Sequence, residues 1–137
     1  MKNLLLILVA ALAFMACQPA KQEEAVFSPK LTLKWESDTV LTTCESVIYD
    51  SANDVLYVAN INGQPTDKDG NGFIAKLGLD GKIVQTQWVT GMDAPKGMGI
   101  YNGKLFVSDI NRIHEIDIAA GAIANTYVVD SAQFLND

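Results

Sequence analysis

The stretch at residues 56–61 reads Leu-Tyr-Val-Ala-Asn-Ile, and the stretch at 105–110 repeats it as Leu-Phe-Val-Ser-Asp-Ile. Each copy follows a short apolar run and a turn, and Asn102-Gly103 in the second turn is a dipeptide suited to a tight hairpin. A further similarity lies downstream, where residues 73–89 correspond to residues 113–129. The repeat therefore predicts two hairpins, which are four β-strands, in each copy.

Four strands at a period of about 40–50 residues are typical of a β-propeller blade. We expect strands in the first copy at 46–50, 55–61, 73–79 and 82–89, and in the second copy at 97–101, 104–110, 112–118 and 122–129. A third copy begins at 134–137. Because a propeller closes into a ring of about 4–8 blades, we expect an all-β propeller fragment of two blades plus the start of a third. We interpret the chain as the front part of a longer protein.

Aromatic residues recur at the outermost strand of the repeat. Trp35, Trp88 and Tyr127 each precede the next repeat by a similar distance. We expect them to pack between neighbouring blades. The first of them predicts a further strand at 31–36, which in a closed ring would complete the last blade.

The N-terminus has the pattern of a secretory leader. A basic Lys2 and a short apolar run precede Phe14-Met15-Ala16-Cys17, which resembles a bacterial lipobox. We expect a lipoprotein signal peptide at 1–16, lipidation at Cys17, a flexible tether at 17–29 and the partial propeller at 30–137. The predicted location is the bacterial cell envelope, anchored to a membrane by lipid, with the outer membrane preferred. An ordinary signal peptide with an incidental cysteine is the alternative.

The composition excludes some classes of partner. The formal net charge is −6, and removal of Lys2 with the leader would make the mature chain one unit more negative. This charge argues against nucleic acid as a partner. Lipidation of Cys17 would leave Cys44 as a single cysteine, which we expect to be a small buried side chain. His114 is the only histidine, and we expect it at the surface.

Strand direction places five polar residues at one end of the inner strands. In a propeller, the first strand of each blade lies nearest the axis. Neighbouring strands alternate in direction, so the start of each first strand lies beside the end of the second strand of the same blade. The strand starts carry Glu45, Lys96 and Asn136, and the strand ends carry Asn60 and Asp109. We expect these five side chains to converge on a central pocket and to bind a ligand.

Four stretches, at 45–47, 56–61, 94–98 and 105–109, resemble the gluconolactonase and senescence-marker (regucalcin) family and, more loosely, NHL-repeat propellers. The similarity covers residues 44–137 and implies a probable six-bladed ring. It also implies an axial divalent cation, Ca²⁺ or Mg²⁺, that acts on a lactone carbonyl or on water.

The same resemblance implies cation ligands at Glu45, Asp109 and Asn136. Lys96 departs from the family pattern, in which asparagine is frequent at that position. An ammonium group there could replace the charge of the cation or accompany it. The chemistry of the site therefore remains open between metal-dependent hydrolysis and binding alone.

A second candidate cation site lies in the loop at 67–72. Asp67, Asp69 and Asn71 occupy the alternate positions of a calcium loop, followed by a glycine. The bidentate glutamate of such a loop is missing, because Gly78 stands in its place. The alternative is an ordinary turn rich in Asp, Asn and Gly.

Three functions follow as alternatives. The first is an envelope lipoprotein whose propeller binds a small sugar-like or lactone-like ligand without chemistry. The second is a lactonase-type hydrolase that depends on a divalent cation. The third is a scaffold that presents loops to a protein partner.

Overall fold

The structure, a computed structural model, describes residues 27–137. The predicted leader at 1–16, the lipidation site Cys17 and most of the tether at 17–29 lie outside the described residues. The compact unit that holds all the strands spans Leu33–Asp137. Residues 27–137 contain no helix of the length and apolarity that a membrane span requires.

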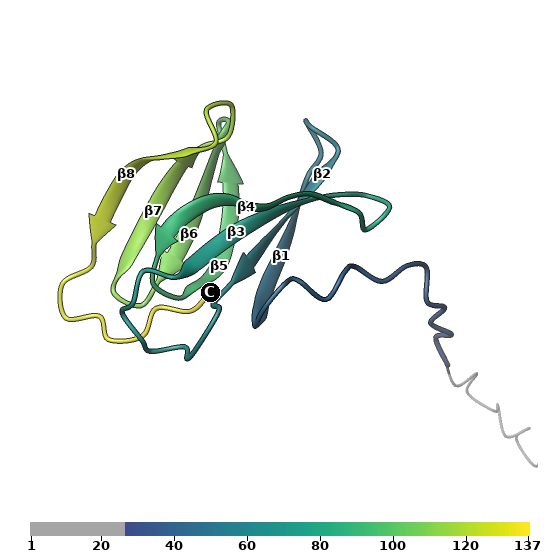
Figure 1. The fold of residues 1–137 in the computed structure, drawn as a ribbon, viewed down its shortest axis with the longest axis horizontal. Coiled ribbons are helices and arrows are strands. Elements are labelled where there is room, and N and C mark those ends of the chain that lie inside the picture. The colour runs from purple at the N-terminus through teal and green to yellow at the C-terminus, as the bar shows by residue number, and fades with distance from the viewer. Residues whose placement is uncertain (1–26) are drawn as a thin grey trace, which may run out of the picture. The chain divides into compact units, whose positions relative to one another are not determined.

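The described chain folds into two antiparallel four-stranded sheets, each in sequence order (Figure 1). The first consists of β1 (Cys44–Asp50), β2 (Val55–Asn60), β3 (Gly72–Gly78) and β4 (Ile83–Met92). The second consists of β5 (Pro95–Tyr101), β6 (Lys104–Asp109), β7 (Arg112–Asp117) and β8 (Ala122–Val128). All eight strands expected from the repeat are confirmed, with ends displaced by at most three residues.

The hairpin turns form where the sequence supplies residues that tolerate positive φ. Asn102 and Gly103, between β5 and β6, have φ of 48° and 73°. Gly81, between β3 and β4, has φ of 81°. Positive φ at both Asn102 and Gly103 gives the twist that a two-residue hairpin requires, whereas the β3–β4 turn has positive φ at Gly81 alone.

Each sheet has two faces, because side chains alternate along a strand. We call the first of them face I. It is made by Tyr57, Ala59 and Ile74 in the first sheet and by Phe106, Ser108 and Ile113 in the second. We call the opposite one face II. It is made by Leu56, Val58 and Leu77 in the first sheet and by Leu105, Val107 and Ile116 in the second. Within each face, the residues from the two sheets occupy equivalent positions of the repeat.

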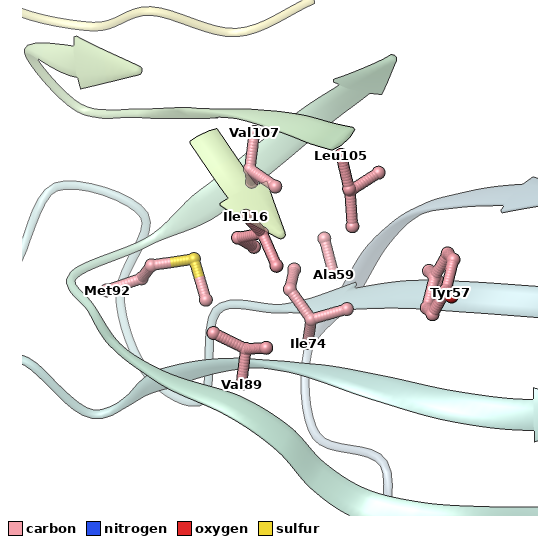
Figure 2. Close-up of a cluster of buried hydrophobic side chains, with 8 residues drawn as sticks. All are labelled: Tyr57, Ala59, Ile74, Val89, Met92, Leu105, Val107 and Ile116. Atoms are coloured by element: carbon pink, nitrogen blue, oxygen red, sulfur yellow. The ribbon is translucent and has the colours of Figure 1, made fainter. Parts of the chain in front are cut away.

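The core lies between face I of the first sheet and face II of the second (Figure 2). Tyr57, Ala59 and Ile74 meet Leu105, Val107 and Ile116 there. Burial of each large aliphatic side chain contributes about 1.5–3 kcal/mol. The contact therefore joins two different faces, face I of one sheet and face II of the next, and we call this head-to-tail packing.

Two tryptophan side chains, Trp88 and Trp35, pack against residues of the two sheets. Trp88 of β4 stacks on Tyr57, with ring centroids 4.5 Å apart. It also covers the β7–β8 turn, where a Cβ built on Gly121 would lie 2.9 Å from the indole Nε1. Trp35 covers the β3–β4 turn in the same way, since a Cβ on Gly81 would lie 2.4 Å from its ring. Trp35 thus has the relation to the first sheet that Trp88 has to the second.

The prediction of a strand at 31–36 is wrong, because the structure shows no strand there. A strand needs a neighbour to pair its backbone N–H and C=O groups, and the described residues provide none beside this segment. Residues 134–137 likewise form no strand. Their backbone nonetheless contacts the second sheet, since Gly97 N–H donates to the Asn136 carbonyl at 2.9 Å.

Candidate functional site

The structure places four of the five predicted site residues at one end of β1, β2, β5 and β6, and places Asn136 beside β5, outside any strand. Strand pairing sets Asn60 opposite Cys44, next to Glu45, and Asp109 opposite Pro95, next to Lys96. The Lys96 carbonyl accepts a hydrogen bond from Ser46 Oγ at 2.5 Å, which links the two strand starts. Asn136 is held beside β5 because its backbone carbonyl accepts a hydrogen bond from Gly97 N–H.

These five side chains differ sharply in exposure. Glu45 and Asn136 are exposed. Asn60 is buried, where its Nδ2 donates to the Val58 carbonyl at 2.9 Å. Asp109 and Lys96 are 0% and 1% exposed. Only two of the five can therefore contact a ligand without a rearrangement of their surroundings.

Asp109 organises the connection between the two sheets. Its Oδ1 accepts from Ala94 N at 2.8 Å, and its Oδ2 accepts from Asp93 N at 2.9 Å. Burial raises the pKa of Asp109, but bonds from His114 and from these two amides outweigh burial and lower it to about 2. Both carboxylate oxygens thus hold protein donors that fix the β4–β5 connection.

The expectation that His114 lies at the surface is wrong, because the residue is only 2% exposed. Its Nε2 lies 3.1 Å from Asp109 Oδ2 and its Nδ1 lies 3.0 Å from Thr126 Oγ1. A carboxylate only accepts hydrogen bonds, so Nε2 carries the hydrogen. The single histidine on β7 thereby anchors Asp109 from the opposite side. No motif around His114 signalled this contact.

Lys96 is a buried cation beneath an aromatic ring. Its Nζ donates to the Ala94 carbonyl at 2.8 Å and lies 4.7 Å from the ring centroid of Phe134. Burial lowers the pKa of Lys96, while the charges of Asp109 and Glu45 act against that change. A cation–π contact of this kind contributes about 0.5–2 kcal/mol. Sequence reasoning missed Phe134, because its relation to Lys96 depends on the path of residues 130–137.

Asp93, beside Asp109, also connects separate segments of the chain through its carboxylate, and the sequence did not indicate this role. Its Oδ2 pairs with Arg112 at 2.6 Å, and its Oδ1 accepts from Gly70 N at 3.0 Å. Gly70 belongs to the loop that was a candidate calcium loop. The loop is therefore tied to the β4–β5 connection and, through it, to the strand ends.

The candidate cation residues of this loop are engaged with one another. Asp69 accepts from Asn71 N at 3.2 Å and from Asn71 Nδ2 at 2.7 Å. These contacts are those of an Asx turn. Asp67 lies in the same loop and is exposed. Within residues 27–137, no group of three or more His, Cys, Asp or Glu side chains is arranged to hold a metal ion.

Cys44 differs from expectation. It was predicted to be buried, but it is exposed at the start of β1. Its Sγ lies 3.6 Å from Asn60 Oδ1, within reach of a weak hydrogen bond. Partial desolvation raises the pKa of the Cys44 thiol, which lowers its reactivity as a nucleophile.

No protein-family model matches the chain, and no curated protein matches it. The resemblance to the gluconolactonase and regucalcin family therefore stays a prediction.

Proposed function

We propose that this chain is part of a lipid-anchored β-propeller that binds a small sugar-like ligand at the inner strand ends. The head-to-tail packing of two equivalent sheets supports the propeller. Face I of one sheet receives face II of the next, and an interface between unlike faces can be repeated until a ring closes. Trp35 on Gly81 and Trp88 on Gly121 repeat the same contact at the outer strands.

The observation that carries the ligand proposal is the half-exposed Phe134 ring above Lys96, at the end that bears Glu45 and Asn136. An exposed carboxylate and amide offer acceptors and donors for ligand hydroxyl groups. An aromatic ring offers an apolar surface to the C–H groups of a sugar ring. Lys96 and Asp109 contribute a fixed local field rather than direct contacts.

The arrangement favours binding over metal-dependent hydrolysis. Asp109 has both oxygens occupied by protein donors. A buried ammonium at Lys96 opposes a cation at the same place through charge repulsion. The oxygens of Glu45 and Asn136 remain, and they can accept hydrogen bonds from neutral hydroxyl groups.

Calorimetry with D-glucose and with glucono-1,5-lactone tests this function. We expect saturable binding of at least one of them, and Glu45→Gln should weaken it about tenfold, since a charged hydrogen bond contributes about 1.5 kcal/mol. Glu36→Gln, at an exposed carboxylate outside the strands, should bind as the parent does. Equal binding by the two variants would contradict the proposal. Binding of Ca²⁺ alone that Glu45→Gln abolishes would favour the hydrolase instead.

The anchoring part of the proposal rests on the sequence around Cys17. In a bacterial host, the mature chain should begin at Cys17 and carry acyl groups, and it should fractionate with membranes. Mass spectrometry of the N-terminal peptide measures this. Cys17→Ser should release the protein from the membrane fraction, whereas Cys44→Ser should not. An unmodified N-terminus at another residue would refute the anchor.

A further inference from the structure

We propose that Thr126 is a nucleophile that takes an acyl group from a small carboxylic ester, with His114 as its base and Asp109 as the group that orients the base. The three residues come from three adjacent strands, β8, β7 and β6. The reacting oxygen belongs to β8, whereas the proposed ligand site lies at the ends of the inner strands, so this inference does not depend on that function.

Thr126, His114 and Asp109 form a continuous chain of hydrogen bonds. Thr126 Oγ1 lies 3.0 Å from His114 Nδ1, and His114 Nε2 lies 3.1 Å from Asp109 Oδ2. A hydroxyl beside an imidazole that a carboxylate orients is the arrangement that activates the nucleophile of many acyl-transfer enzymes. In serine proteases the carboxylate binds Nδ1 and the hydroxyl binds Nε2. Here the two ring nitrogens exchange these partners, and the order of contacts is the same.

The partners of His114 determine which ring nitrogen is the base. Asp109 only accepts, so Nε2 carries the hydrogen, and the neutral ring has its lone pair on Nδ1. Nδ1 is the atom beside the Thr126 hydroxyl, whose hydrogen it can therefore accept. After that transfer, Nδ1–H can donate back to the same oxygen, because a hydroxyl or ester oxygen also accepts. One contact thus serves the ring in both of its protonation states.

Asp109 is suited to hold the imidazolium that the transfer creates. It is fully buried, and the amides of Ala94 and Asp93 fix its two oxygens in place. Its pKa of about 2 keeps it ionised at neutral pH. A fixed negative charge that accepts from the imidazole both orients the ring and stabilises its charged form.

Thr126 is the member of this chain that a substrate can reach. It is exposed, whereas His114 and Asp109 are buried. Strand pairing sets Thr126 opposite His114 and His114 opposite Val107, so Thr126 lies on face II of the second sheet. In the propeller that we propose, a following blade packs on face I, which is the opposite side. Access to Thr126 therefore does not depend on what lies beyond residue 137.

The proposed step is an acyl transfer that needs no oxidant, reductant or metal ion. Thr126 Oγ1 attacks the carbonyl carbon of the ester, an O–C bond forms, and the hydroxyl proton passes to His114 Nδ1. The bond from the carbonyl carbon to the alkoxy oxygen then breaks, and the leaving alcohol takes the proton from Nδ1. Water releases the acid from Thr126 by the same two steps, with His114 again as the base.

Labelling of the full chain with p-nitrophenyl acetate, in a mild detergent, tests the nucleophile. Thr42 is a control within the same molecule, because it is also exposed but its Oγ1 donates to the Asn62 amide oxygen at 2.8 Å. An amide oxygen orients a hydroxyl without acting as a base. Peptide mass spectrometry after acid quenching at successive times should find acetylation of Thr126 about tenfold or more faster than that of Thr42. Equal rates at the two threonines, or no acetyl group on Thr126 at any time, would overturn the proposal.

Three variants separate the roles of the residues. Thr126→Val keeps the shape but removes the hydroxyl, so the label at this position should disappear, whereas Thr126→Ser should keep it. His114→Gln can still donate to Asp109 but offers no base, so acetylation of Thr126 should fall to the rate at Thr42. A His114→Gln variant with the parent's urea midpoint and the parent's rate at Thr126 would overturn the role of His114. The comparison of the two threonines in the parent needs no substitution, so it decides the proposal even where a variant does not fold.

Discussion

Replacing Asp109 by alanine should lower the free energy of unfolding by about 3–5 kcal/mol. The carboxylate is fully buried and accepts from Ala94 N, Asp93 N and His114 Nε2. Its removal leaves three buried donors without an acceptor, and it takes away one of the two negative charges that act on Lys96. Urea denaturation followed by tryptophan fluorescence measures the loss. Asp130→Ala, at an exposed carboxylate, should change stability by no more than about 0.5 kcal/mol.

Acid should produce a smaller loss of stability, with the same origin, in the unmodified protein. The pKa of Asp109 is about 2 in the fold and about 3.9 in an unfolded chain. A depressed folded pKa adds stability above the unfolded value, and this is lost as the pH falls from about 4 to about 2. The linked free energy is about 2.5 kcal/mol. A urea midpoint that falls equally in the parent and in Asp109→Asn across this window would show that Asp109 is not responsible.

The strands could be predicted because their signals are local. Alternation in residues 56–61 and 105–110, with the turn dipeptides Asp80-Gly81 and Asn102-Gly103, determines where strands begin and end. The repeat itself determines which positions share a face. Both depend on neighbours within one hairpin, and the all-β arrangement of two four-stranded sheets follows from them.

The character of the site could not be predicted in the same way. The repeat placed Asp109 and Lys96 at the strand ends, but their burial depends on the connection at 93–95 folding back under both of them. His114 lies on β7 and Asp109 on β6, and nothing in the sequence around a single histidine indicates its hydrogen-bond partner. The strand predicted at 31–36 is absent for a related reason. Its apolar pattern fits a strand, but a strand also needs a neighbouring strand to pair with.

Replacing Gly72 by alanine should cost about 2–3 kcal/mol, because the new methyl group has no room. A Cβ at Gly72 would lie 2.4 Å from Pro95 Cδ and 2.7 Å from the Asp93 carbonyl oxygen. A proline ring and a backbone carbonyl cannot rotate away as a flexible side chain can. The β4–β5 connection must move instead, and it carries the bonds to Asp109. Thermal or urea unfolding of the purified variant measures the cost.

Gly99→Ala is the matched control, since Gly99 is also a strand glycine and a Cβ there would meet nothing within 4 Å. This variant should be neutral or up to about 1 kcal/mol more stable, because alanine loses less backbone freedom on folding. Equal stability of the two variants would show that the connection at 93–95 yields freely. In that case Lys96 and Asp109 would not be held by a rigid junction, and the fixed local field assigned to them at the strand ends would lose its structural basis.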